Sequence, residues 1–237
     1  MNFNFLDTLE PSDDKKVDQW EKEQREIEIK NNLSIFMPYG AENQTFDTFH
    51  VTNEKESELL ECGKRFAESI VNHEFRSLLL LGNVGIGKTH LAYSVMRYVM
   101  ENGMNKKTNT YTSNGFTGTE VFEYPMIAKY FLIPHLVESY TAAQSFDSKV
   151  KQVDIIKNAS SGNLIVLDEL GFGLRYESEI LYQIINNCWI KKIPLILISN
   201  MNEPEFCKLL GNASVDRLKD SVISFNTSGM KSHRGGF

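Results

Sequence analysis

Residues 82 to 89 read Gly-Asn-Val-Gly-Ile-Gly-Lys-Thr and fit the pattern G-x-x-x-x-G-K-[ST], which wraps the phosphates of ATP or GTP. Glycines in such a loop allow a tight turn that points consecutive backbone N–H groups at an anion. Lys88 supplies a positive charge for the β and γ phosphates, and the Thr89 hydroxyl is a ligand for Mg²⁺. The predicted nucleotide-binding residues are Gly82, Asn83, Val84, Gly85, Ile86, Gly87, Lys88, Thr89 and His90.

The segments on either side of this loop predict the elements that must hold it. Residues 77–81 are a short apolar run, typical of a buried parallel strand. Apolar residues recur at helical spacing through 89–102, and Gly103 is a natural stop. A strand, a Gly-rich loop and a helix N-terminus together form an anion site, because the helix dipole and free N–H groups face the phosphate. An ordinary Gly-rich turn, the alternative, would not require these flanks.

Two acidic side chains, Asp168 and Glu169, end the apolar run of residues 164–167. In a P-loop ATPase, the strand beside the P-loop strand ends in an Asp that holds Mg²⁺. A following Glu is placed to orient or deprotonate an attacking water. Two solvated acids after a buried strand are the alternative, and the complete P-loop upstream favours the functional interpretation. We therefore expect Thr89 and Asp168 to be the Mg²⁺ ligands.

Three later polar residues are further candidates. Asn200 follows the strand-like residues 193–199 and could contact the γ-phosphate or the attacking water, although an ordinary strand-end Asn explains it equally well. Arg217 could neutralise the transferred phosphoryl group of a neighbouring subunit, and Arg234 that of its own. From the residues alone, a surface salt bridge is the better explanation of either arginine.

Composition predicts one medium α/β domain with an appendage, since the chain has 237 residues, 41% of them apolar and 24% charged. No apolar stretch approaches the length of a membrane span, and the N-terminus lacks the regions of a signal peptide. We therefore expect a cytoplasmic protein without a membrane partner. The three cysteines, Cys62, Cys188 and Cys207, lack a C-x-x-C spacing and are expected to be reduced packing residues rather than metal ligands.

The net charge of −6 is confined to the N-terminal fifth of the chain. Residues 1–50 hold 11 acidic and 5 basic side chains, which leaves 20 of each sign in the remainder. This argues against non-specific nucleic-acid binding by the N-terminus and suggests an exposed segment or a protein-docking element. Residues 15–32 are predicted to be a charged helix, for which packing of Trp20 on the core and partner binding are about equal alternatives.

Three segments complete the prediction. Residues 54–72 are expected to form an amphipathic helix, and the apolar pattern of residues 125–141 indicates another helix. The polar stretch between Gly103 and Glu120 predicts a hairpin or mobile loop inserted in the core.

Six strings occur in a fixed order between Phe46 and Arg234: LLLLGNVGIGKTHLA, LIVLDELG, RYESEILYQII, LISN, KLLG…VDRL and SHRG. Their order resembles the DnaC-type helicase loaders, which are AAA+ ATPases close to the IstB transposition helpers. The resemblance implies an α/β fold, namely an AAA+ P-loop NTPase with a mostly parallel central sheet flanked by helices and a short helical N-terminal extension. It implies a helical partner-docking segment at residues 1–45 and an ATPase domain at residues 46–237.

The same resemblance implies a role for each matching residue. Lys88 and Thr89 correspond to Walker A, Asp168 and Glu169 to Walker B, Asn200 to sensor I, Arg217 to the arginine finger and Arg234 to the sensor II arginine. Arg175 and Tyr176 correspond to a loop that touches single-stranded DNA. An aromatic ring stacked on a base beside an arginine on the backbone suits binding without sequence readout.

The function implied by the resemblance is ATP-dependent loading of a hexameric replicative DNA helicase onto single-stranded DNA. ATP and Mg²⁺ would be the cofactors, hydrolysis would be slow and assembly-dependent, and the ATP state would self-assemble. Two alternatives stay open: an IstB-like transposition helper, and a non-catalytic, ATP-switched helicase adaptor or inhibitor. The compact form would suit a phage or mobile element.

Overall fold

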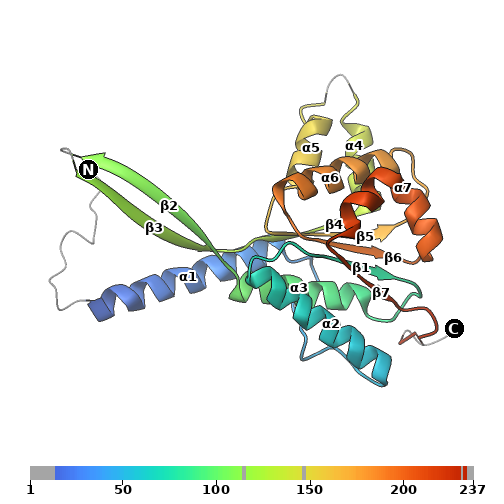
Figure 1. Ribbon diagram of the computed structural model, residues 1–237, viewed down its shortest axis with the longest axis horizontal. Helices are drawn as coiled ribbons and strands as arrows, with labels where there is room; N and C mark the ends of the chain where they lie inside the picture. The colour runs from blue at the N-terminus through green and yellow to red at the C-terminus, as the bar shows by residue number, and fades with distance from the viewer. Residues whose placement is uncertain (1–13, 114–115, 146–147, 231, 234–237) are drawn as a thin grey trace.

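Neighbouring strands of the central sheet all run parallel to one another. The computed structural model describes residues 14–113, 116–145, 148–230 and 232–233. Among them, the sheet comprises β1 (Ser77–Leu81), β4 (Ala128–Leu132), β5 (Leu164–Leu170), β6 (Leu195–Ser199) and β7 (Val222–Asn226). The spatial order is β4-β5-β6-β1-β7, with every neighbouring pair parallel (Figure 1). The predicted mostly parallel α/β fold is confirmed.

One predicted neighbour relation is wrong. We expected the strand that ends in Asp168 to lie beside the P-loop strand β1, but β6 lies between β5 and β1. Ile196 of β6 pairs with Val166 on one side and with Leu78 on the other. Chain order does not fix the spatial order of parallel strands, because crossover connections allow a strand that comes later in the chain to pair between two earlier strands. The consequence is functional, since Asn200 at the end of β6 comes to lie between the loop and Asp168.

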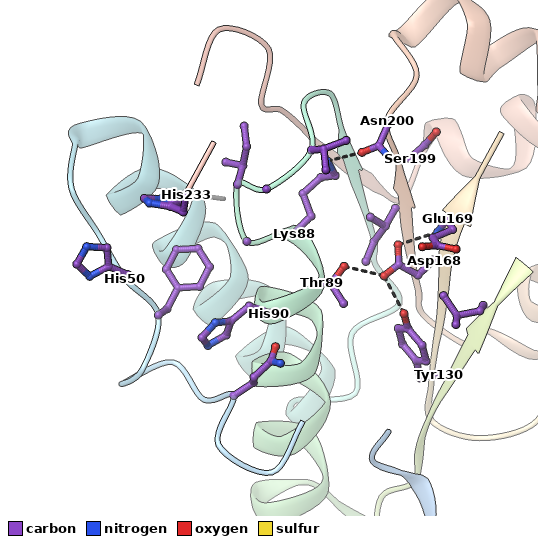
Figure 2. Close-up of a pocket in the computed structure, with 18 of the residues that line it drawn as sticks. His50, Lys88, Thr89, His90, Tyr130, Asp168, Glu169, Ser199, Asn200 and His233 are labelled. Carbon is purple, nitrogen blue, oxygen red and sulfur yellow. Dashed lines mark hydrogen bonds between the residues drawn. The ribbon is translucent and has the colours of Figure 1, made fainter. Parts of the chain in front are cut away.

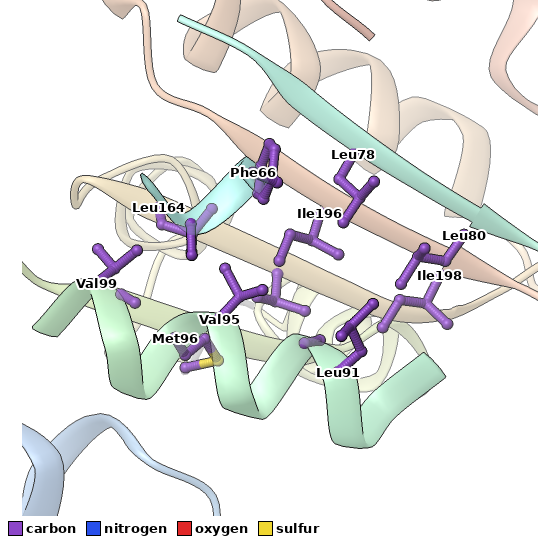
Figure 3. Close-up of a cluster of buried hydrophobic side chains, with 14 of the residues drawn as sticks. Phe66, Leu78, Leu80, Leu91, Val95, Met96, Val99, Leu164, Ile196 and Ile198 are labelled. Carbon is purple, nitrogen blue, oxygen red and sulfur yellow. The ribbon is translucent and has the colours of Figure 1, made fainter. Parts of the chain in front are cut away.

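Helices cover both faces of the sheet, because alternate strand residues point to opposite faces. α2 (Glu54–Val71) and α3 (Lys88–Asn102) pack on the face that carries Leu78, Leu80 and Val166, as Figure 3 shows for α3. The other face is covered by α4 (Ile133–Ala142), α5 (Gln152–Ala159), α6 (Glu177–Lys191) and α7 (Glu203–Lys219). The helices predicted at 54–72 and 89–102 are thus confirmed within one residue.

The apolar segment 125–141 is not one helix. Its first part forms the edge strand β4, in which Ala128 pairs with Leu164 and Leu132 with Asp168, and α4 begins only at Ile133. A short apolar run looks the same in a buried strand and in a buried helix, so periodicity alone misassigned it. Pro134 marks the true start, since proline is tolerated in the first helical turn.

The N-terminal helix and a β-ribbon extend together away from the sheet (Figure 1). α1 (Asp14–Phe36) is longer than the predicted 15–32, and its end, Leu33 and Phe36, packs against the core on the α3 side. β2 (Met104–Ser113) and β3 (Phe116–Pro125) form an antiparallel hairpin, so the polar insertion is a hairpin rather than a loop. No helix in these described stretches is long and apolar enough to cross a membrane.

Candidate functional site

A cavity of about 680 Å³ lies at the carboxyl ends of β1, β5 and β6, beside the N-terminus of α3. Parallel strands present their carboxyl ends at one edge, which is where open α/β sheets bind ligands. The cavity size suits a small organic ligand. Figure 2 shows Lys88, Thr89, Asp168, Glu169 and Asn200 facing this cavity, so residues 112 positions apart in the chain meet there.

The loop after β1 has the backbone that its glycines were predicted to provide. Gly82, Gly85 and Gly87 adopt φ of +104°, +81° and +89°. A Cβ on Gly82 would lie 2.9 Å from the Ser228 nitrogen, and a Cβ on Gly87 would lie 2.9 Å from the ring of Phe49. Glycine is therefore required at both positions by conformation and by space. The loop is held between the chain before α2 and the chain after β7.

Lys88 lies at the centre of the loop and is only 5% exposed. Its Nζ donates to the carbonyl oxygens of Gly82 (2.7 Å) and Asn83 (2.6 Å) and to Oδ1 of Asn200 (3.0 Å). These oxygens compensate a buried ammonium group, which would otherwise be costly. The predicted phosphate-binding lysine and the predicted sensor asparagine are thus in direct contact.

Asp168 is the common hydrogen-bond acceptor in the second half of the site. Its Oδ2 accepts hydrogen bonds from Thr89 Oγ1 (2.8 Å) and Tyr130 Oη (2.9 Å), and its Oδ1 accepts one from the Glu169 backbone N–H (2.7 Å). The carboxylate is buried next to the hydroxyl of the P-loop threonine. Hard oxygen donors of this kind suit Mg²⁺, so Thr89 and Asp168 fit the predicted metal.

Glu169 follows Asp168 at an irregularity in the β5–β6 ladder between Leu167 and Leu170. Its φ of +60° is left-handed, a conformation that a non-glycine residue adopts at some energetic cost. Its side chain is exposed and lines the cavity, whereas the buried Asp168 faces Thr89. The two consecutive acids therefore occupy different environments, one fixed and one open to solvent.

Tyr130 was missed by sequence reasoning. It lies on β4, and burial together with the neighbouring Asp168 carboxylate raises the pKa of its hydroxyl well above the ordinary value of 10. The ring of Tyr93 from α3 packs against it at a centroid separation of 4.9 Å. A tyrosine inside an apolar segment gives no sequence signal for this role, because buried tyrosines are common in cores.

The other end of the cavity is lined by Gln44, Thr48, Phe49, His50, His90 and His233. His90 was predicted to bind nucleotide. Its ring meets the ring of Phe49 in an edge-to-face arrangement with the ring centres 5.3 Å apart, and its Nε2 lies 3.0 Å from the Thr45 carbonyl oxygen. None of the remaining members was predicted to be a site residue, since they come from a linker and from the C-terminal tail.

The C-terminal tail closes over the loop through backbone contacts. Thr227 N–H donates to Leu81 O (2.8 Å), and His233 N–H donates to Gly85 O (2.9 Å). The His233 ring places Nε2 2.8 Å from Oε1 of the buried Glu56. Burial alone would raise the pKa of Glu56, but hydrogen bonds from Thr52 and the nearby histidine outweigh it and lower that pKa. Arg234 lies outside the described residues.

Five of the predicted site residues that the structure describes do not line the cavity: Gly82 and Asn83 at the start of the loop, Arg175, Tyr176 and Arg217. Arg217 on α7 donates to Ala213 O (2.8 Å), and its guanidinium lies 5.3 Å from the ring centre of Tyr182 and 5.8 Å from that of Trp189. Arg175 lies over the ring of its neighbour Tyr176 at 4.7 Å. Arg217 therefore does not line the cavity of its own chain.

Comparison with known proteins agrees with this geometry. Residues 41–130 match the model of the bacterial DnaA ATPase domain. The replicative helicase loader DnaC of Buchnera aphidicola subsp. Acyrthosiphon pisum is 24% identical over 179 residues, which are 75% of this chain and 63% of that protein. The chain therefore spans just under two thirds of that relative's length.

Two solved structures show the same fold. A crystal structure of the DnaC helicase loader has a TM-score of 0.62 at 18% identity and covers 80% of this chain and 99% of its own. The structure of AMPPCP-bound DnaA from Aquifex aeolicus has a TM-score of 0.58 at 16% identity, covering 80% of this chain and 51% of its own. With its parallel sheet and P-loop, the chain has the fold of the AAA+ P-loop proteins, matches the DnaA ATPase domain model over residues 41–130 and is similar in sequence to DnaC-type helicase loaders.

Proposed function

We propose that this chain is an ATP-dependent loader that places a hexameric replicative DNA helicase on single-stranded DNA. The observation that carries the proposal is the convergence of Lys88, Asp168 and Asn200 in one cavity of a DnaC-like fold. Homology to DnaC-type loaders supports the helicase as partner. The cytoplasm is the compartment that this role requires.

The nucleotide chemistry follows from the side chains in the cavity. Lys88, now bonded to Asn200 and to two loop carbonyls, would exchange some of these contacts for phosphate oxygens. When bound, Mg²⁺ would neutralise phosphate charge, and Thr89 and Asp168 would hold it. Glu169, exposed at the cavity, would accept the proton of the attacking water, and Asn200 would position that water or the γ-phosphate.

Hydrolysis would be slow in the isolated chain, because the arginine proposed to neutralise the transferred phosphoryl group does not line this chain's own cavity. Arg217 lies outside it and would supply that charge to a neighbouring subunit, so that catalysis depends on assembly. Arg234 is proposed to act within its own subunit. Arg175, exposed beside the Tyr176 ring, is proposed to contact single-stranded DNA together with that tyrosine.

Helicase docking is assigned to residues 1–45, which include α1. Trp20 of α1 is 45% exposed, and the helix extends beyond the sheet (Figure 1). The end of α1 packs on the ATPase core through Leu33 and Phe36, so removal of the whole segment would expose apolar core residues. Substitutions on the exposed part of α1 are therefore the better probe.

The test is a helicase-loading assay with the full chain, the replicative helicase of its host and protein-coated single-stranded DNA. We expect ATP-dependent deposition of the helicase, retained by Tyr111→Ala and lost by Trp20→Ala, both of which replace an exposed aromatic residue. The proposal fails if the chain neither binds the helicase nor promotes its deposition. ATP-dependent filaments on duplex DNA would favour the transposition helper instead. Unchanged loading by Glu169→Gln would favour the ATP-switched adaptor.

A further inference from the structure

Asp168 is fixed by three donors from three different places in the chain: Thr89 at the start of α3, the Glu169 backbone, and Tyr130 on β4. An ionised carboxylate offers about four lone-pair sites. The bonds from Thr89 and Tyr130 use both sites of Oδ2, and the Glu169 N–H uses one site of Oδ1. Among the described contacts, only the second site of Oδ1 is left, so this arrangement determines which oxygen can face a ligand.

Tyr130 is held rigidly enough to act as a fixed donor. Its backbone pairs with Val166, two residues before Asp168 on the same face of the sheet, so its side chain projects along the strand toward the carboxylate. Its ring packs against Tyr93 of α3 at 4.9 Å. The hydroxyl is directed at Oδ2 in Figure 2, and its 2.9 Å bond lies within the ordinary range.

The Thr89 hydroxyl can donate to Asp168 and still offer lone pairs to a metal, because a hydroxyl has one donor and two acceptor sites. The Tyr130 hydroxyl lies on the far side of Thr89 from Lys88 and donates its one hydrogen to the Asp168 carboxylate, while the Tyr93 hydroxyl is a second hydrogen-bonding neighbour of Tyr130. Partners that orient a metal-binding carboxylate in this way affect metal affinity about 10- to 100-fold when removed.

We infer that Tyr130 is a positioning residue that sets the Mg²⁺ affinity of the nucleotide site by fixing the Asp168 carboxylate. The inference rests on the proposed nucleotide site, but it needs neither helicase nor DNA. It deepens the role of that site by adding a residue from the edge strand of the sheet.

The test compares Tyr130→Phe with Tyr98→Phe, each of which removes one hydroxyl and keeps the ring. Tyr98 lies on α3, packs against Phe46 and does not line the cavity. Binding of a fluorescent ATP analogue is titrated with Mg²⁺ and repeated in EDTA. For Tyr130→Phe we expect the Mg²⁺ midpoint to rise about 10-fold, with analogue affinity in EDTA unchanged. For Tyr98→Phe we expect the wild-type midpoint. Thermal unfolding of both variants separates a folding defect from a site defect.

An Asp168→Asn background supplies the second readout. If Tyr130 acts through Asp168, then Tyr130→Phe has no further effect on the Mg²⁺ midpoint in that background. The inference is overturned if Tyr130→Phe keeps the wild-type midpoint, if Tyr98→Phe shifts it equally, or if wild-type affinity does not respond to Mg²⁺. A chain that binds Mg²⁺ and nucleotide as expected but loads no helicase contradicts the proposed function and leaves this inference intact.

Discussion

Lys88 Nζ donates a 3.0 Å hydrogen bond to Asn200 Oδ1, joining the loop after β1 to the end of the neighbouring strand β6. A P-loop lysine meets the β and γ phosphates, so in the proposed nucleotide complex this contact would bring the Asn200 amide to the γ-phosphate end of the cavity. The contact exists because β6 lies between β1 and β5. In that proposal, Asn200 would respond to the presence of the γ-phosphate, whereas the P-loop backbone would bind the other phosphates.

Asn200→Ala should reduce the rate of ATP turnover about 100-fold while changing nucleotide affinity less than about threefold. The amide would act on the water or the γ-phosphate during reaction, and loss of one such polar contact costs 10²–10³ in rate in other enzymes. Steady-state phosphate release and binding of a fluorescent ATP analogue measure the two effects. Asn212→Ala, at an exposed position on α7, is the control. Equal turnover in the two variants would contradict the role of Asn200.

Much of this site could be predicted from sequence because its parts are contiguous. The loop from Gly82 to Thr89 and the pair Asp168–Glu169 each contain the residue types and the strand context that phosphate and metal chemistry need. The pattern could not show that β6 separates the two strands, because strand order depends on how distant segments pair. The presence of Tyr130 and His233 in the site could not be predicted from the pattern either, since each reaches the site only through tertiary packing.

Glu56→Gln should destabilise the fold at neutral pH and lose that effect in acid. The pKa of Glu56 is lowered on folding, so its charge stabilises the fold above the ordinary value of 4.5. This stabilisation is lost as pH falls through the folded-state pKa. The carboxylate accepts 2.6 and 2.8 Å bonds from Thr52, and loss of such charged hydrogen bonds costs about 1.5–3 kcal/mol.

Chemical denaturation of wild type and Glu56→Gln between pH 3 and about 7 measures this difference in unfolding free energy, since carboxyl groups titrate in that range. Glu58→Gln, exposed and two residues from Glu56 on the same helix, is the matched control. We expect the free-energy gap to close toward acid for Glu56 and to be absent for Glu58. A gap independent of pH would show that Glu56 acts by packing rather than by charge.

Arg217→Ala should abolish cooperative ATP turnover and leave nucleotide binding by the monomer unchanged. The Arg217 guanidinium is near Tyr182 and Trp189 rather than in its own cavity, so its substitution removes no contact to a nucleotide bound in the same chain. Removal of such an arginine in other nucleotide hydrolases costs about 10³–10⁵ in rate. Turnover is measured as a function of protein concentration, with affinity measured at low concentration.

Lys219→Ala provides the control for Arg217, because it removes a positive charge from the same helix at an exposed ion pair with Asp216. It should keep the concentration dependence of turnover. If Arg217→Ala weakens nucleotide binding by the monomer, the assignment to a neighbouring subunit is wrong.

Shortening the β-ribbon should leave the nucleotide site and the core intact. β2 and β3 form a separate two-stranded sheet, and Lys107 pairs with Phe122, so Asn-Gly can replace residues 108–121 as a two-residue turn. The removed residues include the exposed Tyr111 and Val121. The shortened chain keeps Glu123, which is the partner of Arg25 on α1. We expect ATP-analogue affinity within about twofold of wild type and a melting temperature within a few degrees, since exposed positions contribute little to stability. Thermal unfolding and analogue titration measure both quantities. Loss of cooperative unfolding would instead show that the outer ribbon is part of the folding unit and that α1 depends on it.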